Sequence, residues 1–97
     1  MKPTAAQTIA KEELGRLRFP QEAVSLNETH RTELSRKLAR AVRLGNGEHG
    51  KCRILFRDAE GLKVVETTIW SADDRSIVLK SGATIPLARV IDIEMPL

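Results

Sequence analysis

Few residues of this chain are of types suited to chemistry, and one group of them lies close together. His49 and Cys52 are three positions apart, and Asp58 follows six positions after Cys52. Such residues bind metals, but a structural zinc site needs four converging ligands. Cys52 would also form a nucleophile with His30 or His49 as its base, yet no third residue stands out to orient the histidine. Because an unpaired cysteine is usually buried, we interpret Cys52 as a core residue and predict no catalytic, metal or cofactor site.

A second group of charged residues repeats with helical spacing. Apolar residues at positions 34, 38, 41 and 42 follow the i, i+4, i+7, i+8 pattern of one helix face. At about 100° per residue, four basic residues fall on the opposite side. Several cations on one face neutralise phosphates, while a solvated face or pairing with acids is the alternative interpretation. The candidate polyanion or partner contacts are Arg36, Lys37, Arg40 and Arg43, and the acids available to pair with them are Glu60, Glu66, Asp73 and Asp74.

These basic residues need a helix to position them, and the sequence predicts one over residues 27–44. Ser25 and Glu28 fit a capping box, and Asn27 is a rival N-cap. Gly45, the first residue of a Gly-Asn-Gly segment, is the natural C′ residue, so we expect the helix to end there. Residues 1–24 are harder to assign, and we interpret them as an extension that is either a short helix or flexible.

After residue 50 the hydrophobic period changes to two, which is typical of strands. Turn-forming residues divide the rest of the chain into five short strands, expected near 51–57, 62–71, 75–80, 83–87 and 90–95. The second is long and carries apolar residues on both faces, so we expect it to bend. Glu66, in this strand, is expected to pair across strands with Arg53 or Lys80, or to be exposed. The core predicted from these patterns is Leu34, Leu38, Val42, Ile54, Phe56, Val64, Ile69, Ile77, Leu79, Ile85 and Ile93.

One helix followed by five antiparallel strands predicts an α+β fold, in which an N-terminal helix packs on a small five-stranded barrel. The expected domain spans residues 25–97. The order of elements resembles SH3-like barrels, and the preceding helix makes it similar to the Sm-like variant. Residues 30–95 are also similar to short uncharacterised bacterial proteins that share a helix ending in Leu-Gly-Asn, a Val-Glu-Thr-Thr-x-Trp strand and an Ile-Pro segment. Here these read Leu44-Gly45-Asn46, Val65-Glu66-Thr67-Thr68-Ile69-Trp70 and Ile85-Pro86.

The Sm-like resemblance implies a fold but not an RNA site. Sm-like proteins bind single-stranded RNA through an Asp-x-x-x-Asn loop and an Arg-Gly loop. At the corresponding places this chain has Asp73-Asp74-Arg75-Ser76, without the asparagine, and Leu87-Ala88-Arg89-Val90, without Arg-Gly. The RNA-binding residues of that family therefore do not carry over.

Composition narrows the classes of function that remain. The chain has 97 residues, a net charge of +3, one cysteine and three aromatic residues (one Trp and two Phe). Base stacking needs several aromatics on one face, so three aromatic residues argue against a protein that stacks bases. A disulfide within the chain needs two cysteines, so the single cysteine excludes one. No segment approaches the ~20 apolar residues of a membrane span, so we expect a cytoplasmic protein with no membrane partner.

We therefore expect a small non-enzymatic interaction module that binds another protein or itself, most simply as a two-fold dimer. The alternative is a nucleic-acid binder that works weakly, and without sequence preference, through the basic helix face. All the excess positive charge lies in residues 1–50, with nine Lys and Arg against six Asp and Glu, whereas residues 51–97 have seven of each. A neutral second half favours the protein-binding interpretation.

Overall fold

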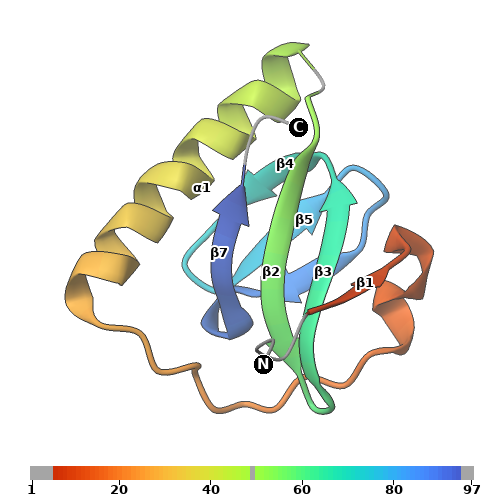
Figure 1. Cartoon of the computed structure of the whole chain (residues 1–97). Coiled ribbons are helices and arrows are strands. Elements are labelled where there is room, and N and C mark those ends of the chain that lie inside the picture. Colours follow the sequence, from red (N-terminus) through yellow and green to blue (C-terminus); the bar gives the residue numbers. More distant parts are fainter. Residues whose placement is uncertain (1–5, 49, 95–97) are drawn as a thin grey trace.

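The computed structural model describes residues 6–48 and 50–94, except for the side chain of residue 48. Their strands form two sheets with a long helix beside them (Figure 1). The larger sheet has the order β1-β3-β2-β7, and the smaller one has the order β4-β5-β6. The elements are β1 (Gln7–Ile9), the 3₁₀ helix η1 (Lys11–Arg16), α1 (Glu28–Glu48), β2 (Cys52–Asp58), β3 (Gly61–Thr67), β4 (Ile69–Ala72), β5 (Ser76–Leu79), β6 (Thr84–Pro86), the 3₁₀ helix η2 (Leu87–Arg89) and β7 (Val90–Glu94).

The structure is α+β, but the prediction of an N-terminal helix on a five-stranded barrel is wrong. Seven strands are present in the described residues, no strand pairing joins the two sheets there, and α1 follows β1 in the chain. The expected long strand over residues 62–71 is divided at Thr68 into β3 and β4, which belong to different sheets. The helix α1 contacts both β4 and β7, which are one edge strand of each sheet (Figure 1). The helix therefore packs against both sheets.

The N-terminal segment contributes to both the sheet and the core. β1 runs parallel to β3, with Gln7 opposite Lys63 and Ile9 opposite Val65. Leu14 on η1 is buried in the core cluster. Further along, the Phe19 ring lies 5.8 Å from the Phe56 ring, measured between centroids. Such parallel pairing joins segments far apart in the sequence, so no local turn signal announces it.

Most of the predicted core is confirmed, and the exceptions reveal which face of a strand points inward. Val42 and Val64 are only partly buried. On β3 the inner face carries Lys63, Val65 and Thr67, not the alternate set that contains Val64. Both faces of this strand are apolar in part, so alternation by itself did not distinguish them. The confirmed core residues are Leu34, Leu38, Ile54, Phe56, Ile69, Ile77, Leu79, Ile85 and Ile93.

The helix does not end at Gly45, as the sequence predicted, but continues to Glu48. Gly45 is buried, and a Cβ placed on it would lie 2.1 Å from the main-chain oxygen of Ile69 on β4. This glycine is therefore needed because two backbones approach closely, not because a helix stops. No helix among the described residues is long and apolar enough to span a membrane.

Replacing Gly45 tests this close approach. We expect Gly45→Ala to lower the free energy of unfolding by roughly 2 kcal/mol, because the clash with backbone outweighs the better helix propensity of alanine. Gly47→Ala is the matched control on the same helix, since nothing lies within 4 Å of its added Cβ. That variant should gain up to about 1 kcal/mol. Equal stabilities of the two variants in urea titrations would show that α1 does not lie so close to β4.

Candidate functional site

The main hollow of the surface runs along one side of α1, between the helix and the segments that follow β4 and β6. We call it the α1 groove. Its two parts have volumes of about 230 and 670 Å³, and they share Ser35, Leu38, Asp74 and Leu87, so they are continuous. Its floor is apolar and is made by Leu34, Leu38, Val42, Ala72, Leu87 and Val90.

Charges of both signs line the rims of the α1 groove. Arg31 and Arg43 stand on the helix side, and Asp73 and Asp74 stand on the turn between β4 and β5. Asp73 helps to build that turn, because its Oδ1 accepts hydrogen bonds from the N–H groups of Arg75 and Ser76, both at 2.8 Å. These bonds hold the pKa of Asp73 below its ordinary value. Asp74 is exposed, and its carboxylate forms no ion pair with any of the described residues.

The opposite wall is held in place by main-chain bonds. The N–H of Leu87, in η2, donates to the carbonyl oxygen of Arg75 at 2.8 Å. The N–H of Asp73 donates to the carbonyl oxygen of Ser76 at 3.0 Å. The rim that carries Asp73 and Asp74 is thereby tied to the wall that carries Leu87. The groove is lined by regular elements and a closed turn, which favours a preformed shape.

The four predicted basic residues do not behave as one set. Arg36, Arg40 and Arg43 are exposed and form no ion pair within the described part of the chain. Lys37 instead lies on the flank of α1 nearest β7, where its Nζ is 2.8 Å from Asp92 Oδ1. This hydrogen bond raises the pKa of Lys37. Asp92 was not among the acids that the sequence indicated as partners.

A second contact fixes α1 against β7. His30 Nε2 donates to the carbonyl oxygen of Ile91 at 2.7 Å. Ile91 directly precedes Asp92 on β7. Two polar contacts one strand residue apart therefore hold the helix beside the outer strand of the larger sheet. His30, which the sequence raised as a candidate base for Cys52, thus has its Nε2 engaged with the main chain of β7.

Cys52 is a core residue, as the sequence predicted, and it is 1% exposed. Burial raises the pKa of its thiol to about 11. The Sγ donates weakly to the carbonyl oxygen of Thr67 at 3.5 Å. His49, its other candidate partner, lies outside the described residues. The thiolate is the reactive form of cysteine, so this thiol is a poor nucleophile near neutral pH.

We expect the folded protein to react with Ellman's reagent at least about 100-fold more slowly than the same protein in denaturing urea, because both burial and the raised pKa oppose attack. The rate of thionitrobenzoate release at pH 7.5 measures this directly. Urea-unfolded protein serves as the reference for an accessible Cys52. Fast reaction of the folded chain at urea concentrations well below unfolding would contradict the buried position.

The outer face of the larger sheet carries a charged cluster that the sequence predicted in part. Arg53 lies 2.8 Å from Glu66 across β2 and β3, so the predicted cross-strand pair is confirmed. A second acid, Glu94 on β7, lies 3.5 Å from the same guanidinium.

On the smaller sheet, Trp70 is 46% exposed at a bulge between β4 and β5. Bulges re-aim side chains, which explains why this large aromatic residue faces solvent.

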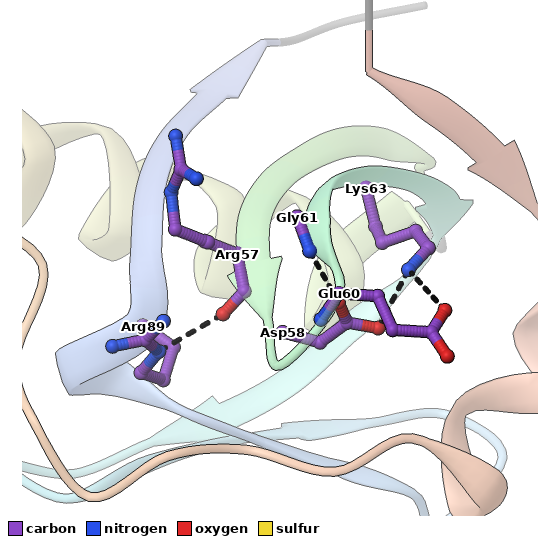
Figure 2. Close-up of polar contacts among 6 residues, drawn as sticks. All are labelled: Arg57, Asp58, Glu60, Gly61, Lys63 and Arg89. Carbon is purple, nitrogen blue, oxygen red and sulfur yellow. Dashed lines mark hydrogen bonds and ion pairs between the residues drawn. The ribbon is translucent and has the colours of Figure 1, made fainter.

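A buried ion pair at the β2–β3 hairpin was missed by the sequence analysis. Lys63 Nζ lies 2.7 Å from Asp58 Oδ2, and the two side chains are 5% and 2% exposed (Figure 2). The Oδ1 of Asp58 also accepts the N–H groups of Glu60 and Gly61, at 2.8 and 3.0 Å. An aspartate three residues before a turn glycine is a signal for such a hairpin, but nothing local shows that a mid-strand lysine points inward.

Comparisons with protein-family models, curated proteins and solved structures found no match for this chain. The resemblance to short uncharacterised bacterial proteins thus remains an expectation from the sequence. The fold defines only a class, a small α+β domain with two sheets and one long helix, and the site must be judged on its own chemistry.

Proposed function

We propose that this chain is a non-enzymatic interaction module that binds a segment of a partner protein in the α1 groove. The observation that carries the proposal is the combination of an apolar floor with rims of opposite charge, Arg31 and Arg43 facing Asp73 and Asp74. Carboxylates on one rim disfavour a nucleic-acid backbone, because they repel phosphates. A peptide with apolar side chains flanked by an acidic and a basic residue matches both rims.

The length of the groove sets the size of the partner segment. Its helix wall runs from Arg31 to Asn46, which at 1.5 Å per residue is about 22 Å. That length accommodates an extended peptide of about six or seven residues or about four turns of helix. The floor then contacts two or three apolar side chains, which is the usual number of anchors in helix-in-groove recognition.

Selection of displayed 12-residue peptides on the full chain, followed by calorimetric titration of the synthetic winners, tests this proposal. Ser35 is exposed on α1 and lines both parts of the groove, so Ser35→Arg should fill it and weaken binding at least tenfold. Thr32→Arg is the matched control, because Thr32 is exposed one turn earlier and does not line the groove. It should bind as the unchanged protein does. Peptides whose affinity ignores Ser35→Arg would contradict the proposal.

The α1 groove would alternatively bind a second copy of the chain, and this alternative needs its own test. Light scattering of the unchanged protein and of Ser35→Arg distinguishes them. A monomer mass for both, together with peptide binding, supports the partner segment. A dimer that Ser35→Arg converts to monomer would overturn it in favour of self-association through this groove.

The exposed arginines favour one further candidate function, weak binding of nucleic acid without sequence preference. Arg36, Arg40 and Arg43 have no ion pair among the described residues, so their charge is available to phosphates. If so, the logarithm of affinity should fall linearly with the logarithm of salt concentration, and Arg40→Ala should lower the slope by about one unit. Lys37→Ala should change it less, because Asp92 already neutralises Lys37. A gel-shift titration at low salt that shows no binding would eliminate this candidate.

A further inference from the structure

A second hollow, away from the α1 groove, contains a buried arginine without a carboxylate partner. Arg89, in η2, is 6% exposed. Its Nε donates to the carbonyl oxygen of Arg57 at 2.9 Å, and one terminal nitrogen donates to the carbonyl oxygen of Glu22 (Figure 2 shows the contact with Arg57). No carboxylate lies within ion-pair distance of this guanidinium in the part of the chain that the structure describes. Arginine stays protonated, so a full positive charge is buried against carbonyl dipoles only.

A second arginine, Arg57, also lines the hollow beside Arg89. It has a volume of about 550 Å³, and its walls are residues 22–26, β2 and β7. Arg57 lines it from β2, is exposed, and forms no ion pair with the described residues. The rest of the lining is mostly apolar, with Ala23, Val24, Leu26 and Ile91, while Glu22 supplies one carboxylate that reaches neither arginine within 4 Å.

The two hydrogen bonds of Arg89 explain why Arg89 is buried, but they do not explain why Arg57 lines the same hollow. They tie residue 22 to β2 and so hold one wall of the hollow. A guanidinium has five N–H donors, and these contacts use two of its nitrogens. Arg57 contributes nothing to that tie through its side chain. Two like charges beside one hollow repel each other, and an anion bound there would offset that repulsion.

We propose that this hollow, the Arg57/Arg89 groove, binds an oxyanion, a carboxylate or phosphate group carried on a short apolar body. Guanidinium groups bind both kinds of oxyanion through paired hydrogen bonds, and a partly desolvated site strengthens such bonds. The apolar body would lie against Val24, Leu26 and Ile91. The site is distinct from the α1 groove, so neither proposal depends on the other.

Titrations followed by ¹H–¹⁵N NMR test the proposal with two probes, inorganic phosphate and hexanoate. Each should shift the amide signals of residues 22–26, 57, 89 and 91 with one saturable curve. Arg57→Gln should weaken binding by about tenfold or more, through loss of charge-assisted hydrogen bonds. Arg57 is suited to replacement because it is exposed and makes no side-chain contact on which folding depends.

Two variants control for the loss of one positive charge. Arg53→Gln removes a cation from the same strand, and Arg36→Gln removes one from α1, and both should bind the probes as before. Tighter binding of hexanoate than of phosphate assigns the site to carboxylates with an apolar chain, and the reverse order assigns it to phosphates. Absence of saturable shifts with both probes would overturn the proposal. So would shifts that Arg57→Gln leaves unchanged, or shifts centred on Arg36, Arg40 and Arg43.

Discussion

Phe56→Ala should lower the free energy of unfolding by roughly 3–5 kcal/mol, the usual cost of truncating a buried phenylalanine. Phe56 is the largest of the fully buried side chains, and its exposed fraction is 0%. Its ring also lies 5.8 Å from the Phe19 ring, so the substitution removes one of the contacts that hold the N-terminal segment to the core. A small domain has a total stability of about 5–15 kcal/mol, so this single change removes a large share of it.

Urea or thermal unfolding followed by circular dichroism measures the effect. Leu55→Ala is the matched control on the same strand, because Leu55 is only partly buried on the outer face of the larger sheet. That variant should cost about 1 kcal/mol, in line with the smaller apolar area it removes from contact. A loss below about 1 kcal/mol for Phe56→Ala would mean that the core is not centred on this residue.

Breaking the buried Asp58–Lys63 pair should cost roughly 3 kcal/mol for either single variant. Asp58→Asn keeps the acceptor that binds the N–H groups of Glu60 and Gly61, but it leaves the Lys63 charge with only the exposed carboxylate of Glu60, 3.6 Å away. Lys63→Met leaves Asp58 as the unpaired charge. An uncompensated buried charge is strongly destabilising, at about 3–5 kcal/mol. The double variant Asp58→Asn/Lys63→Met should cost clearly less than the sum, because it buries no charge at all.

An exposed pair provides the reference for this cycle. Arg53 and Glu66 are 44% and 45% exposed, so Arg53→Met, Glu66→Gln and their combination should each change stability by about 1 kcal/mol or less. Coupling of similar size in the two cycles would show that Asp58 and Lys63 are solvated as fully as the surface pair.

The same pair predicts how stability depends on pH. Burial alone raises the pKa of Asp58, but the hydrogen bonds from Lys63 and from the turn N–H groups outweigh it and lower the pKa. The hydrogen bond to Asp58 raises the pKa of Lys63. The Asp58 contribution is therefore present above the unfolded-state pKa of about 4 and is lost as pH falls through the lowered value. The Lys63 contribution is present below about 10.4 and is lost as pH rises through the raised value.

Chemical unfolding between about pH 2 and 6 tests the acid side of this prediction, where aspartate titrates. The unchanged protein should lose stability more steeply than Asp58→Asn/Lys63→Met, which lacks the pair. Parallel curves for the two proteins would show that other carboxylates cause the acid loss.

Local patterns in the sequence determined the elements that bury one clear face. The i, i+4, i+7 spacing predicted α1, and the alternation through Ile54 and Phe56 predicted β2, because burial of one face leaves a period that can be read directly. Glycine and aspartate predicted the β2–β3 hairpin, since a tight turn requires particular residues at particular places. The same spacing predicted the basic residues of the helix, but it did not predict which acid pairs with Lys37.

Contacts between distant segments decided the rest. Gly45 resembled a helix stop, but the approach of α1 to Ile69 gave it another role. Lys37 matched the exposed arginines in type and spacing until β7 placed Asp92 beside it. The division of one long strand at Thr68 into two sheets, and the parallel pairing of β1, depend on which faces are covered in three dimensions. Residue types record local preference, whereas charge pairing, close approach and strand partnership depend on distances that only the folded chain creates.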